Sequence, residues 1–72
     1  MNGELARRLG RHMRSYRDAR GLSQEAFADE LGYHRTYIGG LERGERNLSL
    51  KAVERLAEQL GMDPLELLSP EG

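Results

Sequence analysis

The chain has 72 residues, no cysteine and a formal net charge of −1 at pH 7. This length supports one small domain over residues 1–72, and the absence of cysteine excludes disulfides and thiolate metal sites. No apolar run approaches the ~20 residues of a transmembrane helix and the N-terminus lacks an apolar signal-peptide core, so we expect a cytoplasmic protein.

The charges are distributed unevenly along the chain. The formal charge is +4 over residues 1–20, −2 over residues 21–47 and −3 over residues 48–72. This polarity is compatible with a DNA-facing N-terminal half. A solvated surface without a nucleic-acid partner explains it equally well, so charge alone does not decide between the two.

Capping residues and the helical spacing of apolar residues predict the first three helices. The first covers about residues 5–20. Ser23 is a good N-cap for the second, which ends at Gly32. The third covers about residues 35–43 and is stopped by Gly44.

Two more helices follow a polar loop. Ser49 caps the fourth and Gly61 closes it. The run Asp63-Pro64-Leu65-Glu66 combines a cap, a proline in the first turn and a glutamate three residues after the cap, which predicts a short helix over residues 64–68. Because strand-forming residues are scarce, the expected fold class is all-α, a compact five-helix bundle.

The second and third helices carry the pattern of a helix-turn-helix over residues 24–43. Ala28 is small where two steeply crossing helices approach closely, and Gly32 suits a left-handed helix end. Ile38 and Leu41 give the next helix an apolar stripe. The usual role of this motif is to place its second helix in the major groove of DNA.

The third helix is poorly made as a helix. Gly39 and Gly40 in its interior each cost about 1 kcal/mol relative to alanine. Arg35 opposes the helix dipole, and His34 stands where serine, threonine or aspartate caps better. Local rules broken together mark a working surface. His34 and His12 have no cysteine or acidic cluster at ligand spacing, so no metal site is expected.

Helical geometry then assigns the faces of this helix. The residues expected to point outward, opposite the apolar stripe, are Thr36, Gly40 and Arg43. The residues expected to contact bases are Arg35, which can donate two hydrogen bonds to a guanine edge, Thr36, and Gly39, where the backbone and DNA can come close. The residues expected to reach phosphates are Gln24, Tyr37, Arg43, Arg46 and Asn47.

Each of these assignments has a plain structural alternative. Arg35 and Thr36 would then be ordinary exposed residues, and Tyr37 would pack on the first helix. Gln24 would only begin the second helix, and the two residues at positions 46 and 47 would be simple loop residues.

The chain resembles the Xre family of phage-repressor-like helix-turn-helix regulators over nearly its whole length. The motifs that carry this resemblance are Leu22-Ser23-Gln24-Glu25, Ala28, Leu31-Gly32, Tyr37-Ile38, Leu41-Glu42-Arg43-Gly44 and Asn47-Leu48-Ser49-Leu50. Within the family, Arg35-Thr36-Tyr37-Ile38 and Arg46-Asn47-Leu48 look most like the controller proteins of restriction–modification systems.

This resemblance implies a lambda-repressor-like DNA-binding domain with a recognition helix over residues 35–43. It also implies a homodimer on a palindromic operator in double-stranded DNA. Members commonly bury an arginine of the first helix against a glutamate that ends the third, and Arg17 and Glu42 hold the matching positions. The sequence departs from the family pattern at His34 and Gly39, where small hydroxylated residues are frequent.

The apolar residues near the C-terminus predict the dimer surface, with inward packing as the alternative; they are Met62, Leu65, Leu67 and Leu68. The competing functions are a DNA-binding antitoxin, an excised domain of a larger repressor and, less favoured, a coactivator-like protein-interaction module. No set of residues suggests an enzyme, and we expect no cofactor, small-molecule ligand or membrane partner.

Overall fold

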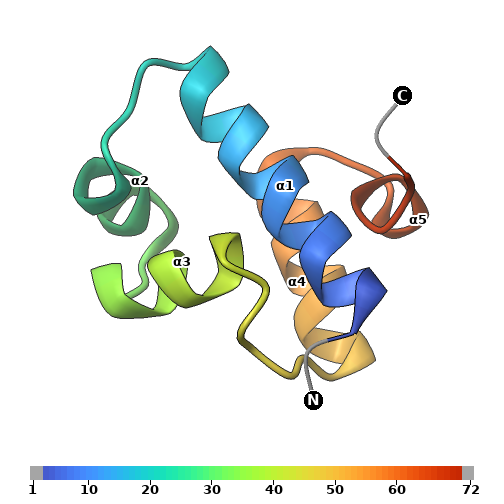
Figure 1. Ribbon diagram of the computed structural model, residues 1–72. Coiled ribbons are helices and arrows are strands. Elements are labelled where there is room, and N and C mark those ends of the chain that lie inside the picture. The colour runs from blue at the N-terminus through green and yellow to red at the C-terminus, as the bar shows by residue number, and fades with distance from the viewer. Residues whose placement is uncertain (1–2, 71–72) are drawn as a thin grey trace.

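Five helices follow one another in the computed structural model, which describes residues 3–70 (Figure 1). They are α1 (Glu4–Ala19), α2 (Gln24–Leu31), α3 (Arg35–Glu42), α4 (Leu50–Leu60) and α5 (Pro64–Leu67). No strand occurs in the described residues, which confirms the predicted all-α class. None of the five helices is long and apolar enough to cross a membrane.

Local capping signals set the helix boundaries, as predicted. Ser23 Oγ accepts a hydrogen bond from the Ala26 backbone N–H at 3.0 Å, and Ser49 Oγ accepts one from Ala52 at 3.1 Å. Gly32 ends α2 in the left-handed region, with a φ of 84°. This conformation costs glycine little, so the chain turns sharply into α3.

Three predicted helix ends differ by one residue from the observed ones. Arg20, Arg43 and Leu68 were expected inside helices and are the C-cap residues of α1, α3 and α5. Because the last residues of a helix lack full hydrogen bonding, boundaries of this kind shift easily and no functional argument depends on them.

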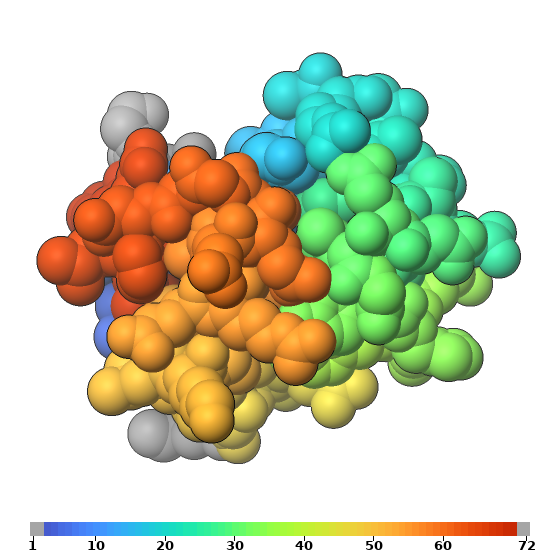
Figure 2. Space-filling view, turned by 180° about the vertical axis from the view of Figure 1, so that it is seen from behind, coloured from blue at the N-terminus to red at the C-terminus, as the bar shows by residue number. Residues whose placement is uncertain are grey.

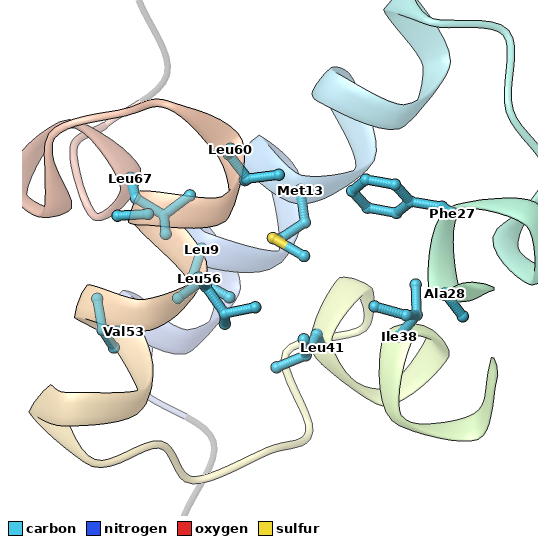
Figure 3. Packing of buried hydrophobic residues seen from close by; sticks show 11 residues of the cluster. Leu9, Met13, Phe27, Ala28, Ile38, Leu41, Val53, Leu56, Leu60 and Leu67 are labelled. Atoms are coloured by element: carbon cyan, nitrogen blue, oxygen red, sulfur yellow. The ribbon is translucent and has the colours of Figure 1, made fainter. Parts of the chain in front are cut away.

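One apolar core joins the helices. α1 packs against α3 and α5, α2 packs against α3, and α4 packs against α5. In Figure 3 the Met13 side chain of α1 extends between Phe27 of α2 and Leu60 of α4. The buried apolar side chains are Leu9, Met13, Phe27, Ala28, Ile38, Leu41, Val53, Leu56, Ala57, Leu60 and Leu67.

The leucines of α5 divide between the core and the surface. Leu67 is 0% exposed, whereas Leu65 is 77% exposed. The prediction that Leu67 lies on a dimer surface is therefore wrong, because this side chain belongs to the core that α5 helps to close. Met62 and Leu68 are half-buried and pack against that core.

α1 approaches the C-terminal end of α3 very closely at Gly10. A Cβ atom at this position would lie 2.4 Å from the Leu41 carbonyl oxygen and 2.7 Å from the Glu42 carbonyl oxygen. Both oxygens belong to the backbone, which cannot swing aside as a side-chain tip can. Gly10 therefore sets the distance between α1 and α3.

We predict that Gly10→Ala lowers the free energy of unfolding by about 2–3 kcal/mol, because the overpacking cost exceeds the gain in helix propensity. Urea denaturation followed by circular dichroism measures this change. Gly3→Ala is the matched control, since a Cβ at position 3 meets nothing within 4 Å. A Gly10→Ala protein as stable as the parent would contradict the close approach.

Candidate nucleic-acid interface

The N-terminal end of α3 is open to an outside partner. Ile38 and Leu41 on its inner side are 0% and 1% exposed. Arg35 and Thr36 are exposed, and within residues 3–70 the Arg35 side chain makes no hydrogen bond or ion pair. A planar guanidinium that the protein does not use is available for two parallel hydrogen bonds to a partner.

An ion pair between α1 and α3 holds the opposite end of α3. Arg17 Nε donates to Glu42 Oε2 at 2.7 Å and Arg17 Nη2 donates to Glu42 Oε1 at 3.0 Å. Their side chains are only 13% and 4% exposed. Hydrogen bonding to Glu42 raises the pKa of the Arg17 guanidinium. The structure thus brings together the two residues that the family resemblance paired.

The same carboxylate ties α2 to the pair. Gln24 Nε2 donates to Glu42 Oε1 at 3.0 Å, and Arg17 Nη1 donates to the Leu22 carbonyl at 2.9 Å. Three helices therefore meet at one largely buried charge pair. Gln24 was expected at a phosphate; its amide already makes an internal hydrogen bond, and the phosphate contact stays a prediction.

The two glycines of α3 are covered by arginine side chains of the same chain. A Cβ at Gly39 would lie 3.1 Å from Arg43 Nη1, and one at Gly40 would lie 3.2 Å from Arg46 Nε. Both glycines are buried. The expectation that Gly40 faces outward is therefore wrong, because Arg46 folds back across it. Contact of Gly39 with a base stays a prediction and requires Arg43 to move aside.

Two neighbouring tyrosine rings lie beside α3, with an arginine side chain on each. The Arg46 guanidinium lies 5.0 Å from the Tyr37 ring centroid, and the Tyr37 and Tyr33 centroids are 4.9 Å apart. Arg55 lies 5.8 Å from the Tyr33 centroid. Such stacking orders both arginines while leaving their N–H groups able to donate. Burial raises the pKa of Tyr37, so its phenol keeps its proton.

Tyr33 and Gln59 join this row to the rest of the fold, and reasoning from the sequence missed both. Tyr33 Oη donates to Gln59 Oε1 at 2.8 Å, and Gln59 Nε2 donates to the Leu31 carbonyl at 2.9 Å. One signal was present in the sequence: Tyr33 follows the glycine that ends α2, a position where an apolar residue often packs back on the helix.

His34 is the N-cap of α3, at the position where serine, threonine or aspartate was expected to cap better. Its Nδ1 accepts a hydrogen bond from the Thr36 backbone N–H at 3.2 Å and lies 2.7 Å from Thr36 Oγ1. An unprotonated imidazole nitrogen accepts as a carboxylate or hydroxyl oxygen does, so the ring replaces the usual capping residue.

The remaining predicted phosphate contacts lie where α3 ends. Arg43 Nε donates to Glu45 Oε1 at 3.0 Å and its side chain is 57% exposed. Asn47 is exposed in the following loop. Across residues 3–70, no group of three or more histidine and acidic side chains is placed to hold a metal ion.

A steep helix pair with an open, arginine-bearing second helix defines a DNA-binding helix-turn-helix regulator of transcription. The helix-turn-helix family model HTH_3 matches residues 13–67, and the chain belongs to this family. Proteins of this kind regulate transcription and are not enzymes.

Several restriction–modification controllers are similar to this chain. It is 45% identical over 64 residues to the control protein C.SmaI of Serratia marcescens, covering 89% of this chain and 76% of that protein. It is 39% identical over 69 residues to C.BamHI of Bacillus amyloliquefaciens, covering 94% and 85%. The crystal structure of the controller C.AhdI from Aeromonas hydrophila matches with a TM-score of 0.69 and 45% identity, covering 86% of this chain and 94% of that one.

We predict that Arg17→Met or Glu42→Met alone lowers the free energy of unfolding by roughly 3–5 kcal/mol, because each leaves a largely buried charge without its bidentate partner, and only the exposed Asp18 remains 3.7 Å from Arg17 when Glu42 is lost. Urea denaturation tests this. The double variant Arg17→Met with Glu42→Met should recover much of the loss, since it buries no unpaired charge. Single variants that each cost under ~1 kcal/mol would show that the pair behaves as an exposed one.

Proposed function

We propose that this chain is the controller protein of a restriction–modification system and binds a palindromic DNA operator as a homodimer. The observation that carries the proposal is Arg35, which is exposed and pairs with none of the described residues 3–70, at the open end of a helix whose other end is fixed by Arg17 and Glu42. Similarity to several controllers supports the particular role.

Arg35 and Thr36 are the proposed base contacts of α3. Both are exposed in its first turn, which in helix-turn-helix proteins is the part of the recognition helix that meets base edges. Arg35 would donate to guanine O6 and N7, the commonest specific contact in the major groove. Contact of Gly39 with a base is also proposed, on the condition that Arg43 swings toward a phosphate.

The proposed phosphate contacts lie along α3, at its C-terminal end and at the start of α2. Arg46 and Tyr37 are stacked on one another, and Arg43 lies at the C-cap of α3. With Asn47 in the following loop and Gln24 at the start of α2, they flank the base-contacting residues. Phosphate contacts fix the register of a protein on DNA and carry no direct sequence information.

Two copies of the domain are needed to bind a palindromic operator, because one copy is too small to reach two successive major grooves. The Cα trace extends 26 × 23 × 20 Å, whereas successive major grooves on one side of B-DNA are ~34 Å apart. A single domain therefore reaches one groove only. Two copies related by a two-fold axis would contact an inverted repeat, which is the proposed palindrome.

The proposed dimer surface is the exposed side of α5, with Leu65, Leu68 and Met62. Leu65 is the most exposed of the three, at 77%. In Figure 2, α5 lies at one edge of the molecule and the helix-turn-helix at the opposite edge, so contact through α5 leaves the DNA-facing surface free. Leu68 also lines a groove of about 240 Å³ with Leu5 and Leu50, which would extend the same interface.

We predict that selection from random duplex DNA yields an inverted repeat and that Arg35→Ala loses about 1–3 kcal/mol of discrimination against other sequences. Fluorescence anisotropy with selected and scrambled duplexes measures it. Arg46→Ala is the control: it should weaken both duplexes alike and reduce the salt slope by about one. Enrichment of no sequence by the parent protein would contradict sequence-specific binding.

We also predict that Leu65→Glu shifts the protein from dimer to monomer without loss of helix content, because a charge would be buried in the interface while the fold leaves position 65 exposed. Sedimentation at micromolar concentration measures this. Ala26→Glu on α2 adds the same charge at the other edge and should leave the dimer intact. If Leu50→Glu dissociates the dimer and Leu65→Glu does not, the interface lies on the groove and not on α5.

A further inference from the structure

His34 does more than cap a helix, because two groups of Thr36 converge on one nitrogen of its ring. The Thr36 backbone N–H is 3.2 Å from His34 Nδ1, and the Thr36 hydroxyl oxygen is 2.7 Å from the same atom. Both residues are exposed and lie at the end of α3 that carries Arg35.

The backbone contact determines where the ring proton lies. A backbone N–H only donates, so Nδ1 must accept and cannot carry a proton. The proton of the neutral ring then lies on Nε2. With Nδ1 unprotonated, the short contact to the Thr36 hydroxyl is one in which the hydroxyl donates its only hydrogen to the ring.

This arrangement changes what Thr36 can offer to DNA. A free hydroxyl both donates and accepts, so it tolerates any base edge. With its hydrogen held by His34, the Thr36 oxygen offers lone pairs and a neighbouring methyl group only. It can accept from the N6 amine of adenine or the N4 amine of cytosine, and it cannot donate to O6 or N7 of guanine or to O4 of thymine.

We propose that His34 is a positioning residue for sequence recognition: it holds Thr36 as a hydrogen-bond acceptor, so that Thr36 selects a base bearing an exocyclic amine. This inference rests on the proposed function, since it assumes that α3 contacts base edges. The inference concerns a single base position of the operator, at which Thr36 accepts a hydrogen bond and does not donate one.

Three variants test it once the parent protein has yielded an operator. Thr36→Val removes the hydroxyl oxygen and keeps the shape of the side chain. The operator position at which this variant loses its base preference is therefore the position that Thr36 contacts. His34→Gly removes the acceptor at a small cost to capping, since glycine is a fair N-cap. His34→Asn keeps an acceptor oxygen and is the conservative replacement.

The expected result is specific to one base position. In the parent and in His34→Asn, adenine or cytosine is preferred there over guanine or thymine by about three- to tenfold, the range for one hydrogen bond. In His34→Gly this ratio falls toward one, because binding to guanine or thymine operators improves. A purely structural cap would instead weaken binding to every sequence equally.

Three results would overturn the proposal while leaving sequence-specific binding in place. With an operator selected by the parent protein, the first is that Thr36→Val changes the preference at no position, and the second is that His34→Gly leaves the base ratio unchanged. The third is a long-range proton–nitrogen spectrum of the His34 imidazole that shows the proton on Nδ1. Failure of the parent to select any operator would count against the proposed function itself.

Discussion

The close contact of α1 with the C-terminal end of α3 is the constraint on which the rest of the structure depends. Gly10 lets α1 lie directly against the Leu41 and Glu42 carbonyls, and at the same end Arg17 holds the Glu42 carboxylate with two hydrogen bonds. A packed backbone and a buried ion pair fix both the distance and the rotation of α3. The N-terminal end of α3 has no comparable contact with α1, so its first turn is exposed at the surface.

The contacts of α3 with α1 explain how α3 stays helical although its sequence has a low helix propensity. A helix of eight residues with two interior glycines is unstable in isolation. The glycines admit arginine side chains: Arg43 lies over Gly39 and Arg46 over Gly40. A Cβ at either position would press on these arginine side chains and force them to shift. The two glycines therefore lower the helix propensity of α3 and leave room for two arginines to lie along it.

Local signals predicted the helices well, because N-caps and closing glycines such as Ser23 and Gly32 act within one turn of chain. Features that depend on a distant partner were not predicted. Nothing near Gly10 in the sequence indicates that α3 backbone will lie against it. α5 has only four residues, too few for apolar spacing to tell the buried Leu67 from the exposed Leu65. The base and phosphate contacts remain predictions, since they require DNA.

The arrangement of charges favours recognition by shape and hydrogen bonding over simple attraction. The +4 charge of residues 1–20 is the excess that remains after Glu4 and Asp18 are counted, and it is partly offset from outside α1, where Glu42 pairs with Arg17 and Glu30 pairs with Arg20. Non-specific affinity for DNA grows with the number of phosphates that a protein neutralises, so few free cations mean weak binding to random sequences. Arg35 adds one cation at the proposed place of base contact. On the proposed function, a nearly neutral protein of this kind gains its affinity from exact placement of a few donors and acceptors and from the second copy in the proposed dimer, so the fixed orientation of α3 matters more than net charge.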